Sequence, residues 1–250
     1  MIPKIIHYCW LGDAPYPPFI NKCIESWKEH LPNYKFILWD KNQFDITKNK
    51  WVEQAYQANK FAFAADYIRF YALYHHGGIY LDADVQVLKS FDDLLQNKSF
   101  IGLESGGDFE AAIIGSEKGC EWVKKILDSY EGRIFLKENG QYDTKPLPLT
   151  LNELLRNYAK VPLVTKVSDQ TFSLPKIFPA EYFSPKNFHT KEIKSTHNTY
   201  CIHHFDGQWI EKNSLQNFKL ALHKSIIKLF GAKLHYMIVR LTRSIQNLRK

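Results

Sequence analysis

The stretch FAFAADYIRFYALYHHGGIYLDADV, residues 61–85, sets four charged side chains in an otherwise apolar and aromatic run. These are Asp66, Arg69, Asp82 and Asp84. Residues 52–76 have the pattern of one long helix, and because its part from Phe61 to Tyr74 is apolar nearly all round, we expect it to be buried on most of its faces. The helix should end at Gly77 and Gly78, since a helix C-cap favours residues that tolerate positive φ. GIYLDADV then predicts a short strand that leaves the core at its two aspartates.

The flanking sequence predicts a mostly parallel sheet covered by helices. IPKIIHYCWLG (2–12) and YKFILWD (34–40) have the pattern of strands, and the segment between them has helical spacing. Strand, helix and strand at this spacing favour parallel pairing, and hence an α/β fold. Further strands are expected at 99–104 and 110–116, and further helices at 119–130 and 149–159.

Composition predicts one main domain with an appendage. The chain has 250 residues, 45% hydrophobic and 24% charged, which is typical of a folded globular protein. Its four cysteines form no C-x-x-C pair, so we expect reduced thiols rather than a disulfide scaffold or a structural zinc site. The N-terminal apolar run is too short for a signal peptide, and no window approaches 18 apolar residues, so we expect neither export nor a membrane span.

The net charge of +7 belongs to the C-terminal tail. No acidic residue follows Glu211, whereas nine lysines and arginines do. We therefore predict a main domain at 1–211 and a basic amphipathic helical tail at 212–250. Residues 214–250 have helical apolar spacing with basic residues on the other face, which favours an anionic membrane surface. A helix packed on its own domain gives the same pattern. Nucleic acid is not expected, because no binding motif accompanies the charge.

Asp82 and Asp84 are the candidate metal ligands. Two positions apart on a strand end, their carboxylates should face the same side. Like charges this close need a cation between them, and Mg²⁺ or Mn²⁺ takes carboxylate and phosphate oxygens. A D-x-D can also be a mere polar strand end. Three residues apart on a helix, Asp66 and Arg69 can pair with each other, and the Gly-Gly turn can bring all four charges to one sheet edge.

IPKIIHYCWLG and AADYIRFYALYHHGGIYLDADV together resemble glycosyltransferase family 32, whose sugar-binding region contains the D-x-D motif. The resemblance covers about residues 1–115, and IHHFDGQW (202–209) is similar to the family's closing His-and-Trp motif. It implies a GT-A fold, a nucleotide-sugar donor, a divalent cation (usually Mn²⁺, or Mg²⁺) and retention of anomeric configuration.

The resemblance also implies roles for particular residues. Trp10 would lie against the nucleobase, and Asp66 and Arg69 would contact the donor sugar and its diphosphate. Asp82 would hold the ribose and the metal shell, and Asp84 would ligate the metal directly.

From the closing motif, His204 would complete the metal site, with His203 as the less favoured partner, and Trp209 would close over the diphosphate. The chain departs from the family pattern at Ala65, where Ser is usual, and at Gln208, where the family has GSW. One of the acids Glu104, Asp108 and Glu110 would orient the acceptor or stabilise a positively charged sugar ring, although acids flanked by glycine are often loop residues. Pro146, Thr150 and Asn152 are similar to a family helix start near the acceptor, and a helix N-terminus explains them without a substrate.

We therefore predict a retaining, metal-dependent glycosyltransferase at the cytoplasmic face of a membrane. It would move a hexose or N-acetylhexosamine, of galactose or glucose type, from a UDP-sugar to a surface-glycan precursor. The acceptor would be lipid-linked, as in capsule or lipopolysaccharide synthesis. Two alternatives remain: a metal-dependent hydrolase of nucleotide diphosphates, and a non-catalytic membrane-associated sugar-binding protein.

Overall fold

The computed structural model describes residues 1–156, 167 and 174–206. The predicted tail and Trp209 lie outside these residues. Contacts divide the chain into two compact units, Met1–Lys186 with Ile193–Trp209, and Asn187–Glu192 with Ile210–Lys250. All the elements described below belong to the first unit. No helix in the described part of the chain is both long and apolar enough to span a bilayer.

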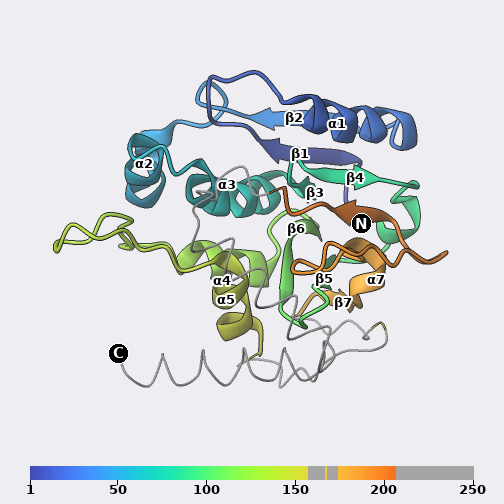
Figure 1. Ribbon diagram of the computed structural model, residues 1–250. Coiled ribbons are helices and arrows are strands. Elements are labelled where there is room, and N and C mark those ends of the chain that lie inside the picture. The colour runs from blue at the N-terminus through green and yellow to red at the C-terminus, as the bar shows by residue number, and fades with distance from the viewer. Residues whose placement is uncertain (157–166, 168–173, 207–250) are drawn as a thin grey trace. The chain divides into compact units, whose positions relative to one another are not determined.

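A six-stranded mixed sheet forms the centre of this unit, in the order β2-β1-β3-β6-β5-β7 (Figure 1). Its strands are β1 (Ile5–Cys9), β2 (Lys35–Trp39), β3 (Gly78–Leu81), β5 (Ser99–Leu103), β6 (Phe109–Ser116) and β7 (Lys176–Phe178). β6 runs antiparallel to both of its neighbours, and the other pairs are parallel. The expected α/β fold with a mostly parallel sheet is therefore confirmed for this unit.

Helices cover the sheet, and a second small sheet lies beside it. The α-helices are α1 (Pro18–His30), α2 (Lys50–Gln57), α3 (Phe61–His76), α4 (Glu121–Asp128), α5 (Leu147–Leu151) and α7 (Ala180–Phe183). Short turns are the 3₁₀ segments η1 (Ile46–Lys48) and η2 (Asp92–Leu94) and the π-helical η3 (Asn152–Arg156). The small sheet pairs β4 (Val85–Val87) antiparallel with β8 (Cys201–His203).

Both faces of the central sheet are buried, because each strand sends alternate side chains into two cores. On β3, Tyr80 packs into a core shared with α2, α3 and α4. Its neighbours Ile79 and Leu81 face a second core that contains residues of α1, β4 and α7. Burial on both faces explains why the strands appear in the sequence as continuous apolar runs.

The predicted helix over residues 52–76 is in fact two helices, α2 and α3. Asn59 between them has φ of 56°, a left-handed conformation that Asn tolerates better than most residues. The indole of Trp51 donates to the carbonyl of Phe63 at 2.8 Å and ties the two helices together. α3 is buried along most of its length, as expected, and it ends at Gly77 with φ of 66°.

Gly77 and Gly78 have to be glycine for reasons of space as well as conformation. A Cβ at either position would lie 2.7 Å from a backbone atom, of Lys118 and Ile5 respectively. Because the turn is this tight, β3 starts directly beneath the end of α3 and returns along it. The charged residues of α3 and those that follow β3 are thereby brought to one edge of the sheet.

Candidate active site

The two aspartates lie in a turn between β3 and β4, not on a strand as predicted. The Val85 N–H donates to the Asp82 carbonyl at 3.0 Å, which closes the turn and directs the chain into a different sheet. The period-two argument for their shared orientation was therefore wrong. The carboxylates still converge, because the turn folds them toward the same point at the carboxyl end of β3.

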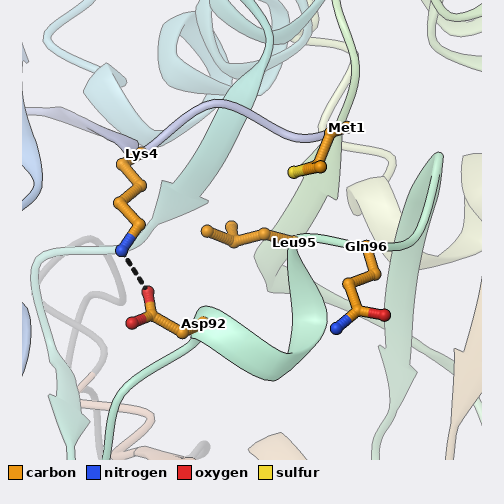
Figure 2. Close-up of a pocket in the computed structure, with 5 residues that line it drawn as sticks. All are labelled: Met1, Lys4, Asp92, Leu95 and Gln96. Carbon is orange, nitrogen blue, oxygen red and sulfur yellow. Dashed lines mark ion pairs between the residues drawn. The ribbon is translucent and has the colours of Figure 1, made fainter.

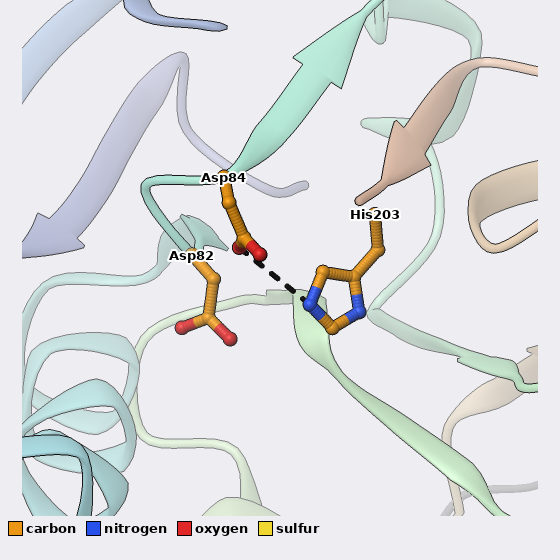
Figure 3. Close-up of side chains that lie close together, drawn as sticks. All are labelled: Asp82, Asp84 and His203. Carbon is orange, nitrogen blue, oxygen red and sulfur yellow. Dashed lines mark ion pairs between the residues drawn. The ribbon is translucent and has the colours of Figure 1, made fainter. Parts of the chain in front are cut away.

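Asp82, Asp84 and His203 form a cluster with the geometry of a metal site. One ligand atom from each lies within 4.8 Å of the others (Figure 3). Asp84 Oδ1 is 3.5 Å from His203 Nε2. Carboxylate oxygens with one imidazole are a donor set that suits Mn²⁺ and accepts Mg²⁺, so the side chains fit the expected cation.

Neighbouring groups hold one oxygen of each aspartate. The hydroxyl of Tyr80 donates to Asp82 Oδ1 at 2.9 Å, and the backbone N–H of Asp206 donates to Asp84 Oδ2 at 2.8 Å. Each carboxylate is thus oriented by the protein through one atom. The second oxygen of Asp84 faces His203 Nε2 at 3.5 Å, on the side where the three side chains converge.

Arg69 connects α3 to this cluster. Its Nη2 lies 3.0 Å from Asp66 Oδ1 and 3.5 Å from Asp82 Oδ1, and its Nη1 donates to the Ala111 carbonyl at 2.6 Å. The guanidinium also stacks 4.7 Å from the Tyr80 ring centre. The prediction that Asp66, Arg69, Asp82 and Asp84 lie together at one edge of the sheet is confirmed.

Asp66 and Arg69 are almost completely buried, which changes what they can do. Burial raises the pKa of Asp66 to about 7, although the charge of Arg69 opposes the shift. Arg69 is 5% exposed and its two terminal nitrogens face protein partners, while its Nε has none. In this structure Arg69 orients two carboxylates, and its predicted contact with the donor diphosphate stays a prediction.

The structure brings His203 to the aspartates, whereas the sequence analysis favoured His204. Consecutive residues of an extended chain face opposite sides, and the ring of His204 turns away. His204 Nε2 is 3.0 Å from Gln86 Oε1, and its Nδ1 is 3.4 Å from Lys186 Nζ. Burial and the Lys186 charge lower the pKa of His204 to about 4, so the ring is neutral with both nitrogens engaged.

His203 lies between two carboxylates. Its Nδ1 is 3.0 Å from Glu110 Oε2, on the side opposite Asp84. Burial lowers the pKa of His203, but the charges of Glu110 and Asp84 outweigh it and raise the pKa to about 10. Burial raises the pKa of Glu110, but the charge and hydrogen bond of His203, together with the Ser184 hydroxyl and the Ala112 N–H, lower it below its ordinary value.

The other expected residues lie as follows. Trp10 follows β1, where its Nε1 donates to the Ala14 carbonyl at 2.8 Å and its ring meets Tyr16 edge-on. Its predicted contact with a nucleobase stays a prediction. Of the expected helix start, Pro146 precedes α5, whereas Asn152 follows its last residue, and the Asn152 side chain donates to Asp108 Oδ1 at 2.9 Å.

Sequence reasoning placed Glu110 near the acceptor and missed its contact with His203, and it missed the hydrogen bond from Tyr80 to Asp82. Glu110 lies on β6, within the expected strand, and is 1% exposed. A usable signal was present, since Glu110 interrupts an apolar strand in the same way that the aspartates interrupt residues 61–85. Tyr80 carries no such signal, because tyrosine is common in strands.

A separate surface pocket is lined by Met1, Lys4, Asp92, Leu95 and Gln96 (Figure 2). Lys4 Nζ lies 2.9 Å from Asp92 Oδ1 across it, and both side chains are well exposed. None of its lining residues belongs to the cluster of Asp82, Asp84 and His203, so this pocket is not part of the candidate site.

Comparison with known proteins agrees with the class that the cluster suggests. Residues 17–101 match the family described as "Glycosyltransferase sugar-binding region containing DXD motif". This stretch is thus similar to a glycosyltransferase sugar-binding region, which agrees with the predicted enzyme class.

Individual relatives cover the chain in part. Inositol phosphoceramide mannosyltransferase 3 of Schizosaccharomyces pombe is 28% identical over 50% of this chain and 36% of its own length. Glucan organizing enzyme 1 of Cryptococcus neoformans is 30% identical over 80% of this chain and 58% of its own. The solved structure titled PaToxG Glycosyltransferase is 20% identical, with a TM-score of 0.47 over 64% of this chain and 70% of that one. The chain thus spans about a third to three-fifths of the two curated relatives.

Proposed function

We propose that this chain is a divalent-metal-dependent glycosyltransferase that moves a hexosyl group from a nucleotide diphosphate sugar to an acceptor. The observation that carries the proposal is the convergence of Asp82 and Asp84, which lie in the matched sugar-binding region, with His203 from β8. Bound there, Mn²⁺ or Mg²⁺ supplies Lewis-acid stabilisation of the negative charge that develops on the departing diphosphate.

The chain's own residues prepare the site for that charge. Tyr80 and Arg69 fix the direction of Asp82, and the Asp206 N–H fixes Asp84, so the carboxylates need no rearrangement to receive a cation. Such preorganisation avoids reorganisation cost when the reaction occurs. Trp10 and Trp209 remain the proposed contacts to nucleobase and diphosphate.

The nature of donor and acceptor is part of the proposal. The resemblance implies retention of configuration and a UDP-linked hexose or N-acetylhexosamine of galactose or glucose type. The name of the Schizosaccharomyces pombe relative adds mannose as a donor sugar and a lipid, inositol phosphoceramide, as an acceptor.

A lipid-linked acceptor also agrees with the basic sequence of residues 214–250, which we propose to contact an anionic membrane from the cytoplasmic side. A role in capsule or lipopolysaccharide synthesis belongs to the same proposal. No general base is assigned, because in a retaining reaction the leaving phosphate can accept the acceptor's proton.

The test combines donor binding with turnover. The purified chain is screened with Mn²⁺ against UDP-galactose, UDP-glucose, UDP-N-acetylglucosamine and GDP-mannose, and a donor that binds should raise the melting temperature. Asp84→Asn should abolish the Mn²⁺-dependent part of this rise. Asp128→Asn is the matched control, since Asp128 is an exposed carboxylate on α4 that pairs with Lys124.

Turnover then separates the proposal from its rivals. Sugar transfer that increases with added acceptor supports a transferase, with short-chain lipid-linked sugars and ceramide phosphoinositol as the acceptor panel. Donor cleavage that is indifferent to every acceptor indicates a nucleotide-diphosphate hydrolase. Metal-dependent donor binding without any turnover indicates a binding protein.

A further inference from the structure

Glu110 is a buried acid that the proposed chemistry has not yet used. It lies near the start of β6, opposite Gly102 on β5, and is 1% exposed. Gly102 leaves room for this arrangement, since a Cβ there would lie 2.8 Å from the Phe183 ring and 3.5 Å from the Glu110 Cβ. A fully buried carboxylate is costly unless it is hydrogen-bonded and paired, so its partners define its role.

Each carboxylate oxygen of Glu110 has one N–H donor. Oε1 accepts from the backbone N–H of Ala112 at 2.9 Å, and Oε2 lies 3.0 Å from His203 Nδ1. An ionised carboxylate only accepts hydrogen bonds, so the imidazole Nδ1 must carry the hydrogen. Nε2 is the atom that faces Asp84, so when a cation displaces the Nε2 proton, the lone pair released there points at the aspartates while Nδ1 keeps its hydrogen.

The neighbouring histidine provides an internal comparison. His204 Nε2 faces the Gln86 side-chain oxygen, and its Nδ1 faces the Lys186 ammonium, which can only donate. The proton of His204 is therefore held on Nε2, and neither nitrogen offers a lone pair to a metal. Of the two adjacent histidines, only His203, whose Nδ1 contacts Glu110, is oriented to bind a metal through Nε2.

We propose that Glu110 is a positioning residue for metal binding, which fixes the tautomer and orientation of His203 so that Nε2 completes a site with Asp82 and Asp84. Metal-ligating histidines characteristically donate their other N–H to a carboxylate or carbonyl, and removing that partner lowers metal affinity. This inference rests on the proposed metal-dependent function. If it holds, the site includes a residue of β6 that contacts a metal ligand without binding the metal itself.

Glu110→Gln is the informative substitution because it keeps the shape of the side chain. Glutamine has one acceptor oxygen for the two N–H donors of Ala112 and His203. If the oxygen stays on the buried Ala112 N–H, the amide NH₂ faces His203 Nδ1 and moves the proton to Nε2. That tautomer has no lone pair directed at the aspartates.

The experiment measures Mn²⁺ affinity of the full chain by electron paramagnetic resonance, without donor. Glu110→Gln should weaken Mn²⁺ binding by about 10- to 100-fold. Gln86→Leu, which removes the side-chain partner of His204, is the matched control and should leave Mn²⁺ affinity unchanged. In the same samples, ¹⁵N spectra of labelled histidines with Cd²⁺ as a diamagnetic probe should show His203 ligated through Nε2 in the wild type. That signal should be lost in Glu110→Gln.

A double-mutant cycle with His203→Gln distinguishes positioning from general structural damage. If Glu110 acts through His203, Glu110→Gln should cause no further loss of Mn²⁺ affinity in the His203→Gln background. Should Glu110→Gln fail to fold, Glu110→Asp, whose shorter side chain cannot span the same distance, replaces it in the cycle.

The outcomes for the two proposals differ. Wild-type affinity in folded Glu110→Gln, together with lost affinity in Asp84→Asn, overturns the role of Glu110 and leaves the metal site standing. Additive losses in the cycle also overturn it. Absence of Mn²⁺ binding by the wild type overturns the proposed metal-dependent function, and the role of Glu110 with it.

Discussion

His7 makes the stability of this fold depend on pH. The side chain lies on β1, fully buried, with Nε2 2.8 Å from the Gly77 carbonyl and Nδ1 3.0 Å from the Trp39 indole nitrogen. The indole N–H can only donate, so Nδ1 accepts and Nε2 carries the proton. Burial lowers the pKa of His7 from 6.5 to about 4, with the Gly77 hydrogen bond opposing the shift.

The sign of the effect follows from proton uptake. In the unfolded chain His7 titrates near 6.5, and in the folded chain near 4, so between these values the unfolded state binds more protons. The free energy of unfolding therefore falls as the pH is lowered through this window, and the contribution is complete above it. At pH 4.5 the loss attributable to His7 is about 2–3 kcal/mol.

The assay is urea unfolding of the wild type and His7→Gln at pH 7.5 and pH 4.5. Glutamine can accept from Trp39 and donate to Gly77, but it does not titrate. His7→Gln should be less stable at pH 7.5, because packing is lost, and the difference should shrink by about 2–3 kcal/mol at pH 4.5. His197→Gln, at an exposed position, controls for the substitution itself. An equal difference at both pH values would refute the reasoning.

Two further substitutions test the core beneath the site. Arg69→Met leaves Asp66 and Asp82 without their buried cation and should lower the free energy of unfolding by about 3–5 kcal/mol, measured in urea. Gly115→Ala places a Cβ 2.1 Å from the Phe100 ring and should cost about 1–3 kcal/mol, measured by thermal unfolding. Adding Phe100→Leu to the Gly115→Ala chain should restore part of that loss.

Each of these predictions has a result that contradicts it. Lys124→Met is the control for Arg69→Met, because Lys124 forms an exposed ion pair with Asp128 whose loss costs about 0–1 kcal/mol. If both variants lose equally little, Arg69 is not holding its carboxylates together. If Phe100→Leu fails to improve Gly115→Ala, ring contact is not the cause of the loss.

Local sequence signals predicted the elements around the site well. The all-round apolar pattern of α3 predicted its burial. The two glycines after His76 predicted the turn that connects α3 to β3. With the strand placed, the position of Asp82 and Asp84 at its carboxyl end followed. These features depend on neighbours within a few residues, which is the range over which periodicity is informative.

Contacts between residues far apart in the sequence could not be predicted from periodicity. The apolar pattern runs on through Asn59, so it could not show that two helices meet there. Glu110 and His203 are 93 positions apart, and their hydrogen bond depends on β8 joining β4 beside β6. Periodicity tells which side chains are buried, but not which distant partner satisfies a buried charge.

The pairing of β8 with β4 also determines which imidazole reaches the aspartates. Val85 lies opposite His203, and Val87 lies opposite Cys201, with all three apolar side chains fully buried. If β8 paired with β4 one residue out of register, every side chain of β8 would face the opposite side of the small sheet. His204 would then take the position of His203. Aliphatic and thiol groups that never touch an ion thus select the ligand, and substitutions among them can alter metal preference without changing any coordinating residue.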